Sequence, residues 1–150
     1  MSIEYRTSLE KFLTDKANRV FKEQRITVDI WEKVPWLRGL PVGGKYWWES
    51  GRGEITIMFP SQKEMEETPE EYILAILSHE LGHAEQRVAT KRRGPMPPPI
   101  EADAWLRGAK YAVALGVKDQ YYQLFTRVAS IDIGEDLRRV RTQIEELLGL

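Results

Sequence analysis

The sequence predicts an α+β fold, in which a small sheet in the first half of the chain is followed by a helical second half. Apolar side chains alternate with period two in segments between residues 25 and 59, and they recur at helical spacing after residue 68. The chain has 150 residues, of which 42% are hydrophobic, so it can bury one core but hardly two. We therefore expect a single domain over residues 1–150.

The first half should contain one helix and three strands. Residues 8–24 predict an amphipathic helix that covers the sheet, because their apolar side chains recur at mostly helical spacing. Residues 25–31 alternate apolar and polar side chains, which is typical of a half-buried strand. Residues 45–49 and 54–59 flank the turn-like Ser50-Gly51-Arg52-Gly53 and predict a hairpin. The sheet is thus expected to be small, antiparallel or mixed, with an edge strand.

The second half should contain four helices. Thr68-Pro69-Glu70-Glu71 predicts the start of the first one, because threonine can cap a helix, proline suits its first position and glutamates complement its positive end. Its end is indicated by Lys91-Arg92-Arg93 and Gly94, ahead of a proline-rich loop. Helical spacing predicts the remaining three helices at residues 100–115, 119–131 and 135–148.

The residues that carry chemistry are concentrated in His79-Glu80-Leu81-Gly82-His83. Two histidines four positions apart lie about 40° from each other around a helix, so both imidazoles can reach one metal ion. The glutamate between them can take a proton from a zinc-bound water and later give it to the leaving amine. The chain has only two histidines, and chance would produce this motif in on the order of one in 800 random placements. The motif therefore predicts a zinc site with its own base, Glu80.

A catalytic zinc ion usually has three protein ligands, so one more donor is needed beside His79 and His83. Glu101 is the candidate, because it begins the helix after the proline-rich loop, and that loop is long enough to reverse the chain direction. Asp103 is the rival, but it points about 200° away from Glu101 around the helix. Its better functional interpretation is a contact with one of the histidines. Glu85 lies on the wrong side of its own helix for the same angular reason.

Small residues are expected to let the two ligand-bearing helices approach each other. Ala104, Gly108 and Ala112 lie on the face of Glu101 and have little side-chain bulk. Gly82 lies between the histidines and costs its helix about 1 kcal/mol relative to alanine, which suggests a packing reason.

The two segments His79–His83 and Glu101–Ala104 together resemble the zincin metallopeptidases of the glutamate-ligand kind, the gluzincins, including the small peptidases of the ImmA/IrrE type. The resemblance covers residues from about 54 to 112. It implies that His79, His83 and Glu101 bind one zinc ion and that Glu80 activates water.

The same resemblance implies a role for the strand that precedes the active-site helix. In that family an edge strand aligns the peptide substrate by main-chain pairing, which assigns this role to Glu54–Phe59. One position differs from several larger gluzincins: four residues after Glu101 stands Trp105, where those proteins have aspartate.

Composition limits the partners. The net charge is -1, so no global field favours nucleic acid or an anionic membrane, and no apolar run is long enough to span a bilayer. The chain has no cysteine, which leaves histidine and carboxylate as the strong metal ligands, and a cytoplasmic setting is the default expectation.

We expect a zinc metallopeptidase that acts on a peptide or protein. Two alternatives stay open: a zincin-fold regulatory or interaction module, and a zinc hydrolase of a non-peptide bond. The donor to the tetrahedral oxyanion is open as well, and the candidates are Tyr46, Tyr72, Tyr111, Tyr121 and Tyr122.

Overall fold

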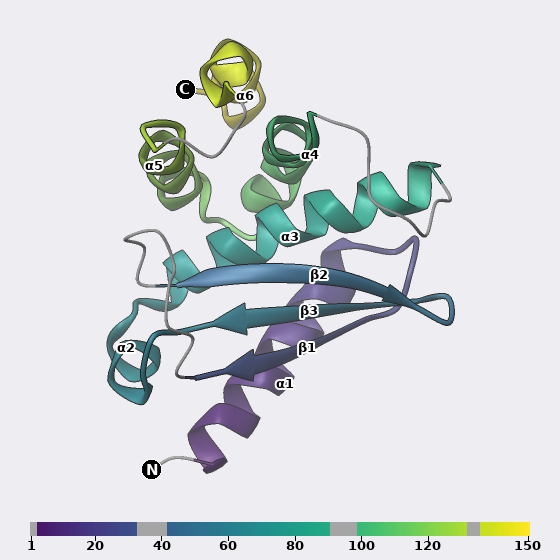
Figure 1. Cartoon of the computed structure of the whole chain (residues 1–150), viewed down its shortest axis with the longest axis vertical. Coiled ribbons are helices and arrows are strands. Elements are labelled where there is room, and N and C mark those ends of the chain that lie inside the picture. Colours follow the sequence, from purple (N-terminus) through teal and green to yellow (C-terminus); the bar gives the residue numbers. More distant parts are fainter. Residues whose placement is uncertain (1–2, 33–41, 91–98, 132–135) are drawn as a thin grey trace.

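The computed structural model describes residues 3–32, 42–90, 99–131 and 136–150. In these residues it is an α+β fold, as the sequence predicts, and it has six α-helices and a three-stranded mixed sheet (Figure 1). The elements in chain order are α1 (Ile3–Val20), β1 (Ile26–Trp31), β2 (Gly43–Glu49), β3 (Arg52–Met58), α2 (Gln62–Glu67), α3 (Glu70–Thr90), α4 (Ile100–Ala114), α5 (Lys118–Ala129), a 3-10 turn (Leu137–Val140) and α6 (Arg141–Leu148).

The strand order is β1-β3-β2, with β1 parallel and β2 antiparallel to β3. The predicted hairpin is confirmed, because β2 and β3 pair from Glu49 and Arg52 outward across a two-residue turn. Both turn residues, Ser50 and Gly51, have positive φ, as a tight turn between twisted strands requires. The assignment of Glu54–Phe59 as the edge strand is wrong. The parallel pairing of β1 with the far side of β3 makes β3 the central strand, so β2 is the edge strand beside α3.

The outer edge of β1 is occupied by side chains of α1. Thr14 and Asn18, four residues apart on the helix, each accept a hydrogen bond from the backbone N–H of a strand residue, Val28 and Ile26 respectively. They also donate to the carbonyl oxygens of the same strand residues. Glu10, one turn earlier, accepts from the next alternate N–H of the strand, at 2.8 Å. These three side chains are called here the α1 ladder, and they satisfy the backbone groups that another strand would use.

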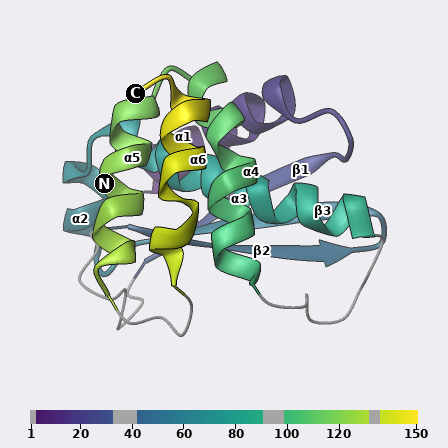
Figure 2. The ribbon, with the colours of Figure 1, turned by 90° about the horizontal axis from the view of Figure 1, so that it is seen from above.

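Helix α3 lies between the sheet and the C-terminal helices. It packs against β2 and β3 on one side and against α4 and α5 on the other (Figure 1). Helices α4, α5 and α6 lie side by side beyond it (Figure 2). Twelve of its 21 residues are buried, which is why its sequence is apolar on more than one face.

Helix boundaries differ from the sequence expectation at several places. Helix α1 begins and ends earlier than residues 8–24, and the short α2 was not predicted. Helix α2 is capped by Ser61, whose hydroxyl accepts from the Glu64 N–H. Thr68 ends α2, since its hydroxyl donates to the Glu64 carbonyl. The predicted end of α3 at Lys91–Gly94 lies outside the described residues, and so does the start of the last predicted helix.

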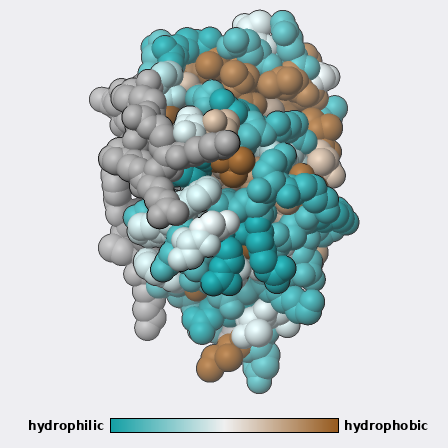
Figure 3. Space-filling view, turned by 90° about the vertical axis from the view of Figure 1, so that its right-hand side faces the viewer, coloured by the Kyte–Doolittle hydropathy of each residue, from teal (hydrophilic) through white to brown (hydrophobic). Residues whose placement is uncertain are grey.

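The surface is mixed in character. On the side of the molecule shown in Figure 3, hydrophobic surface gathers toward the end where the C-terminal helices lie, and the rest is largely hydrophilic. Exposed apolar side chains in these helices include Val113 and Leu147. None of the described helices is both long and apolar enough to cross a membrane.

Candidate metal centre

Helix α3 carries both histidines on one side, with His79 buried and His83 partly exposed. His79 is 6% exposed, and Glu80 beside it is 3% exposed. The two imidazole rings lie one turn apart, with their centroids 4.8 Å from each other. His79, Glu80 and His83 form a group whose potential ligand atoms all lie within 4.8 Å of one another. The spacing in the sequence therefore brings both histidines together beside Glu80, on a helix held between the sheet and α4.

Glu101 reaches this cluster from the first turn of α4. One carboxylate oxygen lies 3.0 Å from Nε2 of His79, and the other lies 3.0 Å from Nε2 of His83. The same nitrogen of each ring thus points at a single carboxylate. The Glu101 side chain is 37% exposed, so the cluster is open to solvent on the Glu101 side.

The close approach of the two helices is confirmed and depends on two glycines. A Cβ on Gly82 would lie 2.2 Å from the carbonyl oxygen of Ala104 and 3.0 Å from the backbone nitrogen of Gly108. A Cβ on Gly108 would lie 2.6 Å from the carbonyl oxygen of Ser78. No side chain could be accommodated at either position without moving backbone atoms. The glycines therefore set the distance at which Glu101 meets the histidines.

Burial and charge shift the acid-base properties of the cluster. Burial alone would lower the pKa of His83, but the hydrogen bond to Glu101, the charges of Glu80 and Glu101 and the contact with Gln86 together outweigh burial and raise that pKa to about 9. Burial would raise the pKa of Glu101, yet hydrogen bonds to both histidines hold it well below its usual range. The pKa of Glu80 is raised, chiefly by burial, with the two histidines acting in the opposite direction.

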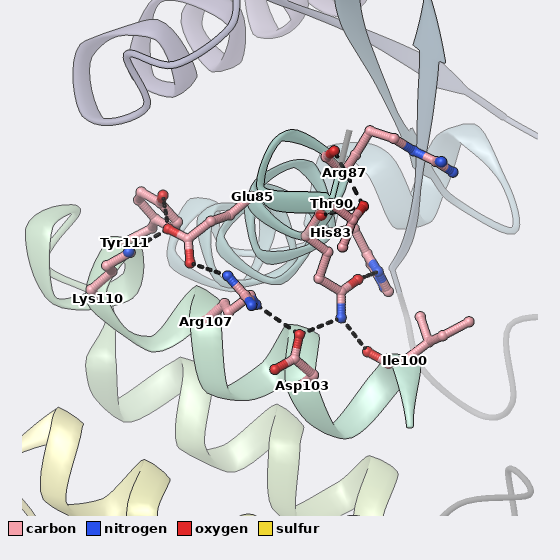
Figure 4. A network of polar contacts seen from close by, with 10 residues as sticks. His83, Glu85, Arg87, Thr90, Ile100, Asp103, Arg107, Lys110 and Tyr111 are labelled. Carbon is pink, nitrogen blue, oxygen red and sulfur yellow. Dashed lines mark hydrogen bonds and ion pairs between the residues drawn. The ribbon is translucent and has the colours of Figure 1, made fainter. Parts of the chain in front are cut away.

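His83 is also held at its second ring nitrogen. Its Nδ1 lies 2.9 Å from the side-chain oxygen of Gln86, whose amide nitrogen contacts the carbonyl oxygen of Ile100 and the carboxylate of Asp103 (Figure 4). Asp103 in turn accepts a hydrogen bond from Arg107. Asp103 is thus linked to a histidine, as the sequence interpretation proposes, but only through Gln86. It does not join Glu101 at the Nε2 atoms.

His79 is held in a different way. Its ring stacks on the indole of Trp105, with centroids 4.1 Å apart and an angle of 26° between the planes. Its Nδ1 atom is buried and has no hydrogen-bond partner among the residues that the structure describes. Trp105 therefore orients the ring through its face, at the position where several larger gluzincins have aspartate.

The edge strand β2 touches the candidate base. A Cβ on Gly44 would lie 2.7 Å from Cγ of Glu80 and 2.9 Å from one of its carboxylate oxygens. Only a glycine at this position leaves Glu80 its observed place. The strand therefore passes directly beside the base.

The remaining candidates have other partners. Glu85 faces away from the histidines, as expected, and contacts Arg107, Lys110 and Tyr111 (Figure 4). Each of the five tyrosine hydroxyls considered for the oxyanion donates elsewhere: the acceptors lie, in the order of the tyrosines along the chain, on Gln24, Gln123, Glu85, Trp105 and Glu145. None of them is assigned to the oxyanion.

Gln86 and Trp105 were not predicted to act on the histidines. Gln86 follows His83 by three residues and so shares its side of the helix, a spacing that could have identified it. Trp105 follows Glu101 by four residues, but only the crossing of the two helices brings its ring onto His79.

Comparisons with protein-family models, with curated proteins and with solved structures gave no match. The likeness to gluzincins accordingly rests on the two motifs and their residues.

Proposed function

We propose that this chain is a zinc-dependent hydrolase, and specifically a peptidase with a zincin-like site, in which His79, His83 and Glu101 hold the metal. The observation that carries the proposal is the convergence of both Nε2 atoms on one carboxylate, each at 3.0 Å. Two imidazoles and a carboxylate are a common ligand set for catalytic zinc. In a tetrahedral site, ligand atoms about 2.1 Å from the metal are spaced about 3.4 Å from one another, close to the separations seen here.

The donor set fits zinc in further respects. His83 is fixed through Nδ1, which leaves Nε2 for the metal, and such support is typical of metal-binding histidines. Glu101 is partly exposed, which leaves a side open for water and substrate. A zinc ion bound by these residues would supply a Lewis acid and a water molecule of lowered pKa.

Glu80 is the proposed base. It is buried beside the histidines, and burial raises its pKa above the ordinary value of a glutamate, which makes the carboxylate a better proton acceptor. Its carboxylate would accept the proton of the attacking water and deliver it to the departing amine nitrogen. Because Gly44 confines Glu80 against β2, the carboxylate would keep one position while it accepts the proton and while it returns it.

The peptide class of substrate is proposed from the sheet. In the described residues no backbone group pairs with the outer edge of β2, whereas the α1 ladder occupies that of β1. An extended peptide could therefore add to β2 as a fourth strand. Its main chain would then run past Gly44, beside Glu80.

The experiment compares the parent with Glu80→Gln and, as a control on the same helix, with the exposed Glu71→Gln. All three should bind one zinc ion per chain by elemental analysis. The parent and the control should cleave members of a peptide library, and Glu80→Gln should lose at least about 1,000-fold in kcat, because an amide cannot accept the proton.

Each outcome separates the candidate functions. A parent that binds no zinc after refolding with excess metal contradicts the metal site. Zinc binding without any hydrolysis favours a regulatory or interaction module, and hydrolysis of esters or deacylation without peptide cleavage favours a hydrolase of another bond. Equal peptide cleavage by Glu80→Gln and parent would show that Glu80 is not the base.

A further inference from the structure

Gln86 joins the two helices that carry the proposed ligands. It belongs to α3 and is 4% exposed, so its amide has little access to water. Its side-chain oxygen lies 2.9 Å from Nδ1 of His83. Its nitrogen lies 2.8 Å from the carbonyl oxygen of Ile100 and 2.9 Å from the carboxylate of Asp103, both in the first turn of α4 (Figure 4).

The chemistry of these contacts fixes which way the amide faces. A backbone carbonyl and a carboxylate only accept hydrogen bonds, so the atom of Gln86 that contacts both must be its NH2 group. The atom that faces His83 must then be the amide oxygen, which also only accepts. Nδ1 of His83 must therefore carry a proton, so Nε2 is the nitrogen whose proton a metal would replace.

We propose that Gln86 is the positioning residue of the metal site, keeping a proton on Nδ1 of His83, so that Nε2 is the nitrogen left for a metal, and directing Nε2 toward Glu101. The consequence for zinc rests on the proposed function, whereas the contact itself is a feature of the fold. The hydrogen bond also fixes the rotation of the ring about its bond to Cβ. A metal can be bound only if this rotation directs Nε2 toward it.

The position of Gln86 couples the ligands to each other. The carbonyl that it contacts belongs to Ile100, the residue immediately before Glu101. One amide thus contacts the imidazole of a ligand on α3 and the backbone beside the ligand on α4. Asp103, the second acceptor, is held in place by Arg107 at 2.7 Å. A movement of the first turn of α4 would therefore disturb His83 as well as Glu101.

The test uses three variants. Gln86→Leu removes the acceptor and the donors while roughly preserving volume. Gln24→Leu is the matched control, because Gln24 is similarly buried and its oxygen accepts from Tyr46 instead of from a histidine. Asp103→Asn keeps an oxygen that can accept from both Gln86 and Arg107, so it removes the charge of Asp103 while the contact between Gln86 and His83 stays intact.

Two readouts are measured for each variant. Long-range proton–nitrogen NMR spectra of the imidazole rings, with and without zinc, report which nitrogen of His83 is protonated and how fast that proton exchanges with water. Competition with a chelator gives the zinc dissociation constant. In Gln86→Leu the Nδ1 proton should lose its protection in both states, and the dissociation constant should rise about 10- to 100-fold.

The control and Asp103→Asn should both stay within about 3-fold of the parent dissociation constant, and Asp103→Asn should keep the protected Nδ1 proton. Unchanged proton protection and zinc affinity in Gln86→Leu would overturn the proposal. Loss of the Nδ1 protection in Asp103→Asn would also overturn it, because the charge of Asp103 and not the amide of Gln86 would then hold the ring. If the parent binds no zinc, the proposed function fails, but the spectra of the metal-free protein still decide whether Gln86 holds the ring.

Discussion

Adding a methyl group to Gly82 should both destabilise the protein and weaken zinc binding, because this glycine sets the separation of α3 and α4. The Cβ of Gly82→Ala would lie 2.2 Å from the carbonyl oxygen of Ala104, whereas ordinary contacts begin near 3.4 Å. The obstructing atom belongs to the backbone and cannot rotate away. The helices would therefore have to separate by about 1 Å in a densely packed region.

The magnitude follows from two opposing effects. Overpacking of a core costs about 1–3 kcal/mol, and a clash with backbone belongs at the upper end of that range. Alanine stabilises a helix by about 1 kcal/mol relative to glycine. The net loss in the free energy of unfolding should be about 2 kcal/mol. A shift of about 1 Å in Glu101 also far exceeds the roughly 0.2 Å tolerance of zinc–ligand distances, so we expect the zinc dissociation constant to rise about 10- to 100-fold.

The assay is urea unfolding of the metal-free protein together with chelator competition for zinc. Gly51→Ala is the control, because Gly51 has a φ of 78° and nothing within 4 Å of an added Cβ. It should cost about 1–2 kcal/mol through backbone strain and leave zinc affinity unchanged. A Gly82→Ala protein that is more stable than the parent and binds zinc equally well would refute the helix contact described here.

Three further outcomes are expected. Glu101→Ala should raise the zinc dissociation constant about 100-fold in chelator competition, because Glu101 faces both Nε2 atoms. Asp103→Ala should have a far smaller effect, and a larger effect of Asp103→Ala would reverse the ligand assignment. In the protein without zinc, the pKa of His83 is about 9 in the folded state and about 6.5 in the unfolded state. Its protonation therefore adds up to about 3 kcal/mol to the free energy of unfolding. This stabilisation is complete below pH 6.5 and is lost as the pH rises through 9. Urea unfolding between pH 6 and 10 measures this, and Glu101→Gln should flatten the profile; a parent profile already flat over that range would contradict it. Gly44→Ala should lower kcat about 10-fold or more at unchanged zinc affinity, since it displaces Glu80 and Ile76 but no proposed ligand, and full activity would mean that the base does not depend on β2.

The sequence was most informative where the physics is local. The periodicity of residues 25–31 and the composition of the hairpin depend on near neighbours, and both predictions are confirmed. The spacing of His79 and His83 follows from helix geometry alone. Glu101 was predicted because the loop after α3 is long enough to reverse the chain direction, and the structure places its carboxylate beside both histidines.

What the sequence could not provide depends on contacts between distant segments. The alternation of side chains in β3 is the same whether that strand is central or at an edge of the sheet. The pairing of β3 with β1 could therefore not be predicted from this alternation. The stacking of Trp105 on His79 needs the crossing of two helices at Gly82, which periodicity permits but does not specify. The short α2 has too few residues for a helical period, although its capping serine was visible.

The α1 ladder has a consequence for self-association. Because Glu10, Thr14 and Asn18 already use the backbone groups on the outer edge of β1, a second molecule cannot extend the sheet there. Growth by edge-to-edge pairing would have to occur at β2, the strand that passes beside Glu80. Any dimer or aggregate built through the sheet would therefore compete with substrate for the same edge, so that activity should fall as protein concentration rises wherever such pairing takes place.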